Sequence, residues 1–356
     1  MRTDKKIKKL ICTIFICLAI ISCKKEPMKA PTDDNKTKTN YSWSCSVTSI
    51  KDYPIEITTG YLATKKDFIA AFRNNGIEDD GWDVDGQEGG SGGNQVPSLL
   101  SLTWVSYAEK KVWFLDEGAL PSDKILALFQ EGFYNIDNAS QQPVHETYQH
   151  IVVGVAPGGV VVVFLTGDFH RVEVARFQAT ETAEDVNKTM RRPGIYKDTK
   201  AFLEDGFKTL FTAEQQANFK NNGIPFGLWD TYRTRYNWRF DMKFYKEEDK
   251  LAKNTHVQYI NGEEDKLDLK EANKFKNQTL PKTVTFYYKN NWNEAIFDET
   301  EIVEAFKKAT QDNPQAEVTI IAKVQFMYKS VKFAVKCGDK EINLQKVTVE
   351  AGGYGQ

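Results

Sequence analysis

Histidine is scarce in this sequence, with four among 356 residues, and their spacing excludes the common histidine-based metal sites. His145 and His150 lie five residues apart, whereas the zinc-protease motif needs a spacing of four on a helix. His150 leads into an expected strand, and His170 and His256 lie beside strand ends without a neighbouring cluster of acids or cysteines. We therefore predict no metal site and no cofactor.

A usable serine nucleophile is also lacking. Residues 89–93 read Gly-Gly-Ser-Gly-Gly and match the G-x-S-x-G elbow by letter. That elbow needs a strand before the serine and a helix after it, and neither pattern flanks Ser91. The segment from Asp79 to Asn94 instead predicts a Gly-rich acidic loop, solvated or, as the alternative, holding a weak calcium ion. We predict no catalytic residue.

The chain has no excess of positive charge. Its formal net charge is -2, and removal of residues 1–22, which hold five basic residues and Asp4, changes this to -6. Nucleic-acid binding depends on Lys and Arg that neutralise phosphates, so we expect no nucleic-acid partner.

No apolar run is long enough to span a bilayer. The longest, Leu10 to Ile21, has twelve residues where roughly 20 are needed, and it follows five basic residues. Residues 20–23 read Ile-Ile-Ser-Cys, which looks like a bacterial lipobox. It implies cleavage before Cys23 and attachment of acyl chains there, which would hold the protein on a membrane surface. We expect an outer-membrane lipoprotein of the cell envelope, periplasmic or surface-exposed.

Few cysteines remain after this processing. Cys12 and Cys17 leave with the signal and Cys23 is acylated, so Cys45 and Cys337 are left. Each lies on the apolar side of an alternating strand. Separate burial as small hydrophobic residues and a disulfide between the two are both open, and the pattern favours burial.

The rest of the chain divides by composition. We predict a signal peptide over residues 1–22, a disordered tether over 23–40, a first module over 41–180, a helical connector over 181–228 and a second module over 229–356. Within the first module we expect a short helix over Lys66 to Arg73, a capped helix starting at Ser122, and three strands between Tyr148 and Ala179.

The order of elements in the first module recurs in the second. Tyr236-Asn-Trp238 echoes Tyr41-Ser-Trp43, a hairpin after Pro281 echoes the one after Pro97, and each hairpin precedes one helix. The expected fold class is α+β, with two similar modules, each a mostly antiparallel sheet packed with one main helix.

Candidate contact residues lie in two places. Trp82 is a large aromatic within the acidic loop, where it either folds back onto a core or awaits a partner. The stretch from Trp229 to Tyr245 predicts a two-faced strand whose polar face includes Arg233, Arg235 and Arg239, a row suited to an anionic partner or simply to water.

Several of these motifs together resemble one bacterial lipoprotein family, known only as domain of unknown function 2931. The motifs are Tyr41-Ser-Trp43, Gly81-Trp82, Pro97-Ser-Leu with Leu-Thr-Trp104, Val155-Ala-Pro-Gly-Gly-Val160, and Trp229-Asp-Thr-Tyr with Arg235-Tyr-Asn-Trp238. The resemblance extends over about residues 41–240 and implies no activity for any of these positions.

The expected function is that of a non-enzymatic, lipid-anchored envelope protein that binds another envelope protein or an incoming toxin. Trp82, Trp229, Arg233, Arg235 and Arg239 are its candidate contact residues. The alternative is a surface module that binds or hydrolyses glycan, using carboxylates near Trp82.

Overall fold

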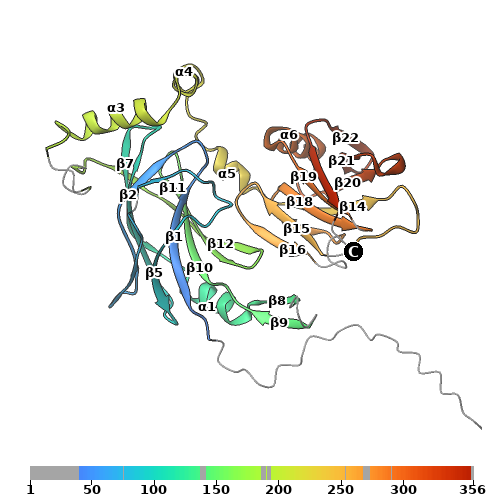
Figure 1. The fold of residues 1–356 in the computed structure, drawn as a ribbon, viewed down its shortest axis with the longest axis horizontal. Helices are drawn as coiled ribbons and strands as arrows, with labels where there is room; N and C mark the ends of the chain where they lie inside the picture. The colour runs from blue at the N-terminus through green and yellow to red at the C-terminus, as the bar shows by residue number, and fades with distance from the viewer. Residues whose placement is uncertain are drawn as a thin grey trace, which may run out of the picture. The chain divides into compact units, whose positions relative to one another are not determined.

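A meander of three antiparallel strands occupies the region between Tyr148 and Ala179, as its turns predict. The strands are β10 (His150–Ala156), β11 (Val160–Gly167) and β12 (His170–Gln178). The computed structural model describes residues 40–74, 76–136, 142–185, 190, 194–252, 254–267, 273–289 and 291–353 (Figure 1). The expected signal peptide, Cys23 and nearly all of the tether lie outside these ranges.

The N-terminal half, from β1 to β13, contains two sheets that pack face to face around one core. The first sheet has the order β5-β1-β10-β11-β12, in which β1 pairs in parallel with β10. The second has the order β13-β7-β6-β2-β3 and is antiparallel. The bounds of the elements not yet given are β1 Trp43–Ser49, β2 Ile55–Ala63, β3 Phe68–Ala71, β4 Ile77–Glu78, β5 Gln87–Gly93, β6 Leu99–Ser106, β7 Lys111–Ala119, α1 Ser122–Glu131, β8 Phe133–Ile136, β9 Pro143–Glu146 and β13 Thr180–Thr182.

Helices α3 (Thr199–Leu210), α4 (Ala213–Asn222) and α5 (Leu228–Tyr232) connect this half to the next. Thr212 and Gln215 form the capping box that their spacing predicts, and Gly223 ends α4 with a φ of 73°. Phe202, Phe211 and neighbouring apolar side chains of these helices pack on Tyr107 and Val112.

The C-terminal half, from β14 to β23, repeats the strand order of the N-terminal half. One sheet has the order β17-β14-β20-β21-β22, with β14 and β20 parallel, and the other runs β16-β15-β18-β19-β23. The bounds are β14 Tyr236–Lys243, β15 Thr255–Tyr259, β16 Glu264–Leu267, β17 Lys276–Gln278, β18 Pro281–Tyr288, β19 Asn291–Ile296, α6 Glu299–Ala309, β20 Val318–Val324, η1 Phe326–Tyr328, β21 Val331–Cys337, β22 Lys340–Leu344 and β23 Thr348–Gly353.

Side-chain detail follows the same correspondence. Trp43 of β1 donates its indole N–H to the carbonyl of Gln95 at 2.8 Å, and Trp238 of β14 donates to the carbonyl of Thr279 at 2.8 Å. Each acceptor lies two residues before the proline that opens the next hairpin. Helix α1 follows β7 as α6 follows β19.

The expected α+β class is wrong. Strands hold 48% and helices 17% of the described residues, so the protein is mostly β. Each half is built around two sheets. The helix that follows the hairpin, α1 in the N-terminal half and α6 in the C-terminal half, is a minor part of that half. The proposed module boundaries stay a prediction, and the described residues all belong to one compact unit.

Four local predictions also fail. Residues 68–71 form strand β3, because they pair with the end of β2. Residues 87–93 form strand β5, where glycine is needed for close approach of the backbone: a Cβ on Gly89 would lie 2.8 Å from the Ala71 carbonyl oxygen. The stretch from Trp229 to Tyr245 begins as helix α5 before it becomes β14. Helix α1 has no side-chain cap from Ser122.

Cys45 and Cys337 are both free, which matches the favoured prediction of separate positions, although Cys337 is only partly buried. Among the described residues, no helix combines the length and hydropathy that a bilayer span requires.

Candidate binding surface

One face of β10 and β11 is apolar and lies outside the core of the N-terminal half. Its side chains Val152, Val162 and Phe164 are fully buried, because they pack with residues of the C-terminal half in a second core. The β15–β16 turn closes over it: a Cβ on Gly262 would lie 3.1 Å from Trp82 and 3.3 Å from Phe164. The C-terminal half therefore covers this face.

Trp82 lies within that junction. It is 3% exposed and donates its indole N–H to the carbonyl of Val155 at 3.0 Å, while its ring meets Phe164 edge-on. The Gly-rich acidic segment thus folds back onto a core, which was one of the two outcomes expected for this tryptophan.

Two carboxylates next to Trp82 are paired, so this segment is not a merely solvated loop. Asp83 pairs with Lys282 of the C-terminal half at 2.8 Å, and Asp85 pairs with the buried Arg171 at 2.5 Å. Burial lowers the pKa of the Arg171 guanidinium, and Asp85 opposes that shift. Arg171 is also the β12 residue whose pairing with Glu264 connects the two halves into a ten-stranded sheet.

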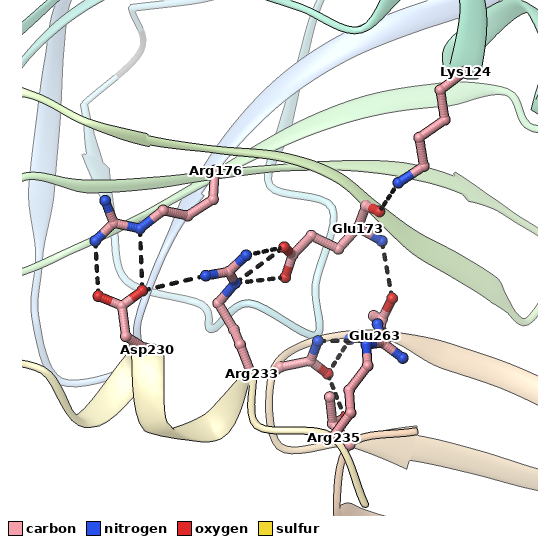
Figure 2. Close-up of polar contacts among 9 residues, drawn as sticks. Lys124, Glu173, Arg176, Asp230, Arg233, Arg235 and Glu263 are labelled. Atoms are coloured by element: carbon pink, nitrogen blue, oxygen red, sulfur yellow. Dashed lines mark hydrogen bonds and ion pairs between the residues drawn. The ribbon is translucent and has the colours of Figure 1, made fainter. Parts of the chain in front are cut away.

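Two of the predicted arginines belong to the same junction. Arg233 donates to both carboxylate oxygens of Glu173 at 2.5–3.0 Å and contacts Asp230, which also accepts from Arg176 (Figure 2). The hydrogen bonds to Glu173 raise the pKa of Arg233.

Arg235 donates to Glu263 at 2.6 Å, and Glu263 in turn accepts the backbone N–H of Glu173 at 3.2 Å (Figure 2). The forked guanidinium-carboxylate contact between Arg233 and Glu173 restrains the relative position of the segments that carry the two residues.

The candidate contact residues therefore fall into two groups. In the first group, Trp82 and Trp229 are buried, and Trp229 is 2% exposed and packs edge-on against Tyr53. Arg233 and Arg235 belong to the same group because each is paired with a carboxylate of the chain. Arg239 lies elsewhere, on the face of β14 that points away from the core of the C-terminal half. That any of the five contacts a partner stays a prediction.

Arg239 lies in a groove of about 970 Å³ over strands β14, β20 and β21. Its guanidinium stacks on the Phe275 ring at 4.8 Å and makes long hydrogen bonds, at 3.4 Å to Thr319 Oγ1 and 3.5 Å to the Asn273 carbonyl. In the described part of the chain, no carboxylate pairs with Arg239 or with Lys336 on β21. Further charged lining residues are Asp241, Lys243, Asp312, Glu317, Asp339 and Lys340.

This groove lies on the face that corresponds to the covered face of the N-terminal half. Trp43 of β1 and Trp238 of β14 occupy equivalent positions. When the strand pairing is followed from each of them, Val162 corresponds to Lys332 and Phe164 corresponds to Ala334. Ser44 corresponds to Arg239 in the same way. The face is apolar and covered in one half, and basic and exposed in the other.

Sequence reasoning missed Lys336, Lys323 and Lys332. A signal was present: Lys332 and Lys336 alternate with apolar residues along β21, and Lys323 lies between Ala322 and Val324 on β20, which marks one solvent-facing side of a sheet. What the sequence did not reveal was that the matching side of the other half is covered. The residues described contain no group of three or more His, Cys, Asp or Glu placed to hold a metal ion.

A family model described as "Protein of unknown function (DUF2931)" matches residues 28–227, more than half of the chain. The chain belongs to this family. The match ends next to α5, so the DUF2931 region comprises the N-terminal half with α3 and α4, and the C-terminal half lies beyond it. Neither the curated proteins nor the solved structures gave a match.

The junction pair Arg233–Glu173 should contribute more to stability than an exposed pair of similar length. Their side chains are 29% and 13% exposed, compared with 39% and 56% for Lys111 and Glu181 at 2.7 Å. Double-mutant cycles with alanine, followed by chemical denaturation, should give a coupling of about 1–3 kcal/mol for the first pair. The control pair should stay below about 1 kcal/mol. Equal couplings would mean that the junction contact is energetically an ordinary surface pair.

Proposed function

We propose that this DUF2931 protein is a lipid-anchored protein of the cell envelope that binds another protein without catalysing a reaction on it. The anchor is Cys23. The binding surface is the groove over β14, β20 and β21. Arg239 and Lys336 are the lining cations that pair with no carboxylate of the described residues, and Phe275 is the aromatic wall.

One observation carries this proposal. The same sheet face occurs twice in the molecule, and in the N-terminal half it is covered by apolar packing with a neighbouring β layer. In the C-terminal half it is hollowed and bears charged and aromatic side chains. The face in the N-terminal half thus already binds another part of the chain. The equivalent face in the C-terminal half is more polar, which suits a partner protein that also exists unbound.

Arg239 is the side chain best prepared to recognise a carboxylate of the partner. Phe275 holds its planar guanidinium in place, and its long contacts to Thr319 and Asn273 leave N–H donors available for shorter bonds. Asp241 and Asp312 are paired with Lys243 and Lys340, so they oppose an acidic ligand less than free carboxylates would.

The anchor is tested by replacing Cys23 with serine. The thiol is the acylated atom in the proposal, so the variant should no longer incorporate labelled fatty acid and should leave the membrane fraction. Labelling with a fatty-acid analogue and fractionation of cells measure both. A Cys17→Ser variant, which changes a signal-peptide thiol, is the matched control and should remain labelled. Undiminished labelling of the Cys23 variant would contradict the anchor.

The binding surface is tested by photo-crosslinking in cells of the native host. A crosslinking residue at Thr319 or Lys336 should give a discrete adduct with one protein, whereas the exposed edge positions Thr180 and Glu181 should not. Arg239→Glu should abolish the adduct, because it reverses the charge that faces the partner. Arg239→Lys should weaken it, because an ammonium lacks the guanidinium fork.

The same adduct in all variants, or adducts only at the edge positions, would contradict the proposed surface. Unfolding midpoints of the Arg239 variants separate lost binding from lost folding, since an exposed-face substitution should leave the midpoint nearly unchanged.

A further inference from the structure

The connection between β20 and β21 exposes apolar side chains in a strained conformation. Phe326 and Met327 of η1 are 62% and 60% exposed. Met327 and Tyr328 have φ values of 54° and 59°, a left-handed region that residues other than glycine adopt at a cost. The corresponding connection in the N-terminal half, between β10 and β11, uses Gly158 and Gly159 for its positive φ angles. We call residues 325–330 the hairpin tip.

Contacts beneath the hairpin tip hold it in this conformation. The Tyr328 hydroxyl donates to Asp249 and accepts from Lys289, whose ammonium also lies 3.9 Å from the centre of the Tyr328 ring. Tyr245 packs edge-on against both Phe326 and Tyr328. Tyr328 therefore anchors the turn, and the side chains of Phe326 and Met327 point to solvent.

A row of lysines crosses the sheet next to the hairpin tip. Lys323 is the register partner of both Lys243 and Lys332, and all three are exposed. Like charges directly opposite one another destabilise a sheet, a cost that a bound anion removes. Lys243 is paired with Asp241 at 2.9 Å, and no carboxylate of the described residues pairs with Lys323, Lys332 or the neighbouring Lys329.

Acidic residues nearby do not cancel this charge. Asp249 is engaged by Lys289 and Tyr328, and Glu248 lies 3.8 Å from Lys246. Glu247 is exposed in the same loop. Positive charge from the lysines therefore dominates where the hairpin tip joins the sheet.

We propose that the hairpin tip docks onto an anionic lipid surface. Phe326 and Met327 enter the interfacial layer of the membrane, and Lys323, Lys329 and Lys332 contact the anionic headgroups. Exposed apolar side chains flanked by lysines are the combination that binds such surfaces, and lysines near them are attracted to anionic lipids.

This inference rests on the proposed anchor. The 18 residues from Cys23 to Asn40 reach at most roughly 60 Å when fully extended, so an anchored protein is always close to lipid headgroups. Docking of the hairpin tip would then orient the protein on the membrane and leave the other end of the same strands, with Arg239 and Lys336, to the protein partner.

Oxidation of Met327 tests the docking on the acylated protein in purified vesicles. Mass spectrometry after mild peroxide treatment compares vesicles containing phosphatidylglycerol with vesicles of phosphatidylcholine alone. Met327 should oxidise several-fold more slowly on the anionic vesicles, and high salt should remove the difference. Met242, partly buried in the same half, serves as the internal reference and should oxidise equally in both.

Two sets of variants identify the groups responsible. Lys323→Glu with Lys332→Glu should abolish the protection, whereas Lys65→Glu with Lys66→Glu on the N-terminal half should not. Phe326→Ser should reduce it, and Phe68→Ser, which changes another exposed phenylalanine, should not.

Equal oxidation of Met327 on both vesicle types, with the protein still floating with the vesicles, would overturn the inference. Protection that needs an added envelope protein would overturn it as well and assign the hairpin tip to that protein. Failure to float would instead contradict the anchor, so the two failures are distinguishable.

Discussion

The apolar outer face of β10 and β11 is the constraint on which the rest of the structure depends. Strand β11 carries Val162 and Phe164 on one side and valines with Leu165 on the other, and such a strand is stable only when both sides are removed from water. One side is covered by the second sheet of the N-terminal half. The other is covered by the C-terminal half, with Trp82 and Gly262 in direct contact across the junction. The C-terminal half thus buries a face that the family domain preceding it would otherwise expose to water.

Charged side chains position this apolar contact. Arg171, Arg233 and Arg235 each meet a carboxylate at the junction, at 2.5–2.6 Å for the shortest contact. Ion pairs of this kind add little net free energy unless they are desolvated, but the forked contact between Arg233 and Glu173 restrains the relative position of the two halves. Arg233 and Arg235 of the predicted arginine row are thus mainly internal contacts, and Arg239 alone of the row pairs with no carboxylate of the described residues.

The sequence predicted strand order better than it predicted fold class. Turn residues and alternation located β10, β11 and β12, and the capping box located α4, because those signals are local. Class failed because β3 and β5 are defined by pairing with distant strands, and because the glycines of β5 look like a flexible loop until the backbone of β3 lies against them. The candidate site was predictable only in part: the arginines could be named, but which ones face carboxylates of the same chain depends on how the two halves pack.

Exchange of one matched pair of residues tests the central claim, that the same face is covered in one half and bare in the other. Val162→Lys places in the N-terminal half the residue found at Lys332, and Lys332→Val does the reverse. Chemical denaturation should show Val162→Lys lowering the free energy of unfolding by roughly 3–5 kcal/mol, since it buries an unpaired charge. Lys332→Val should change it by less than about 0.5 kcal/mol. Similar values for the two variants would contradict the account.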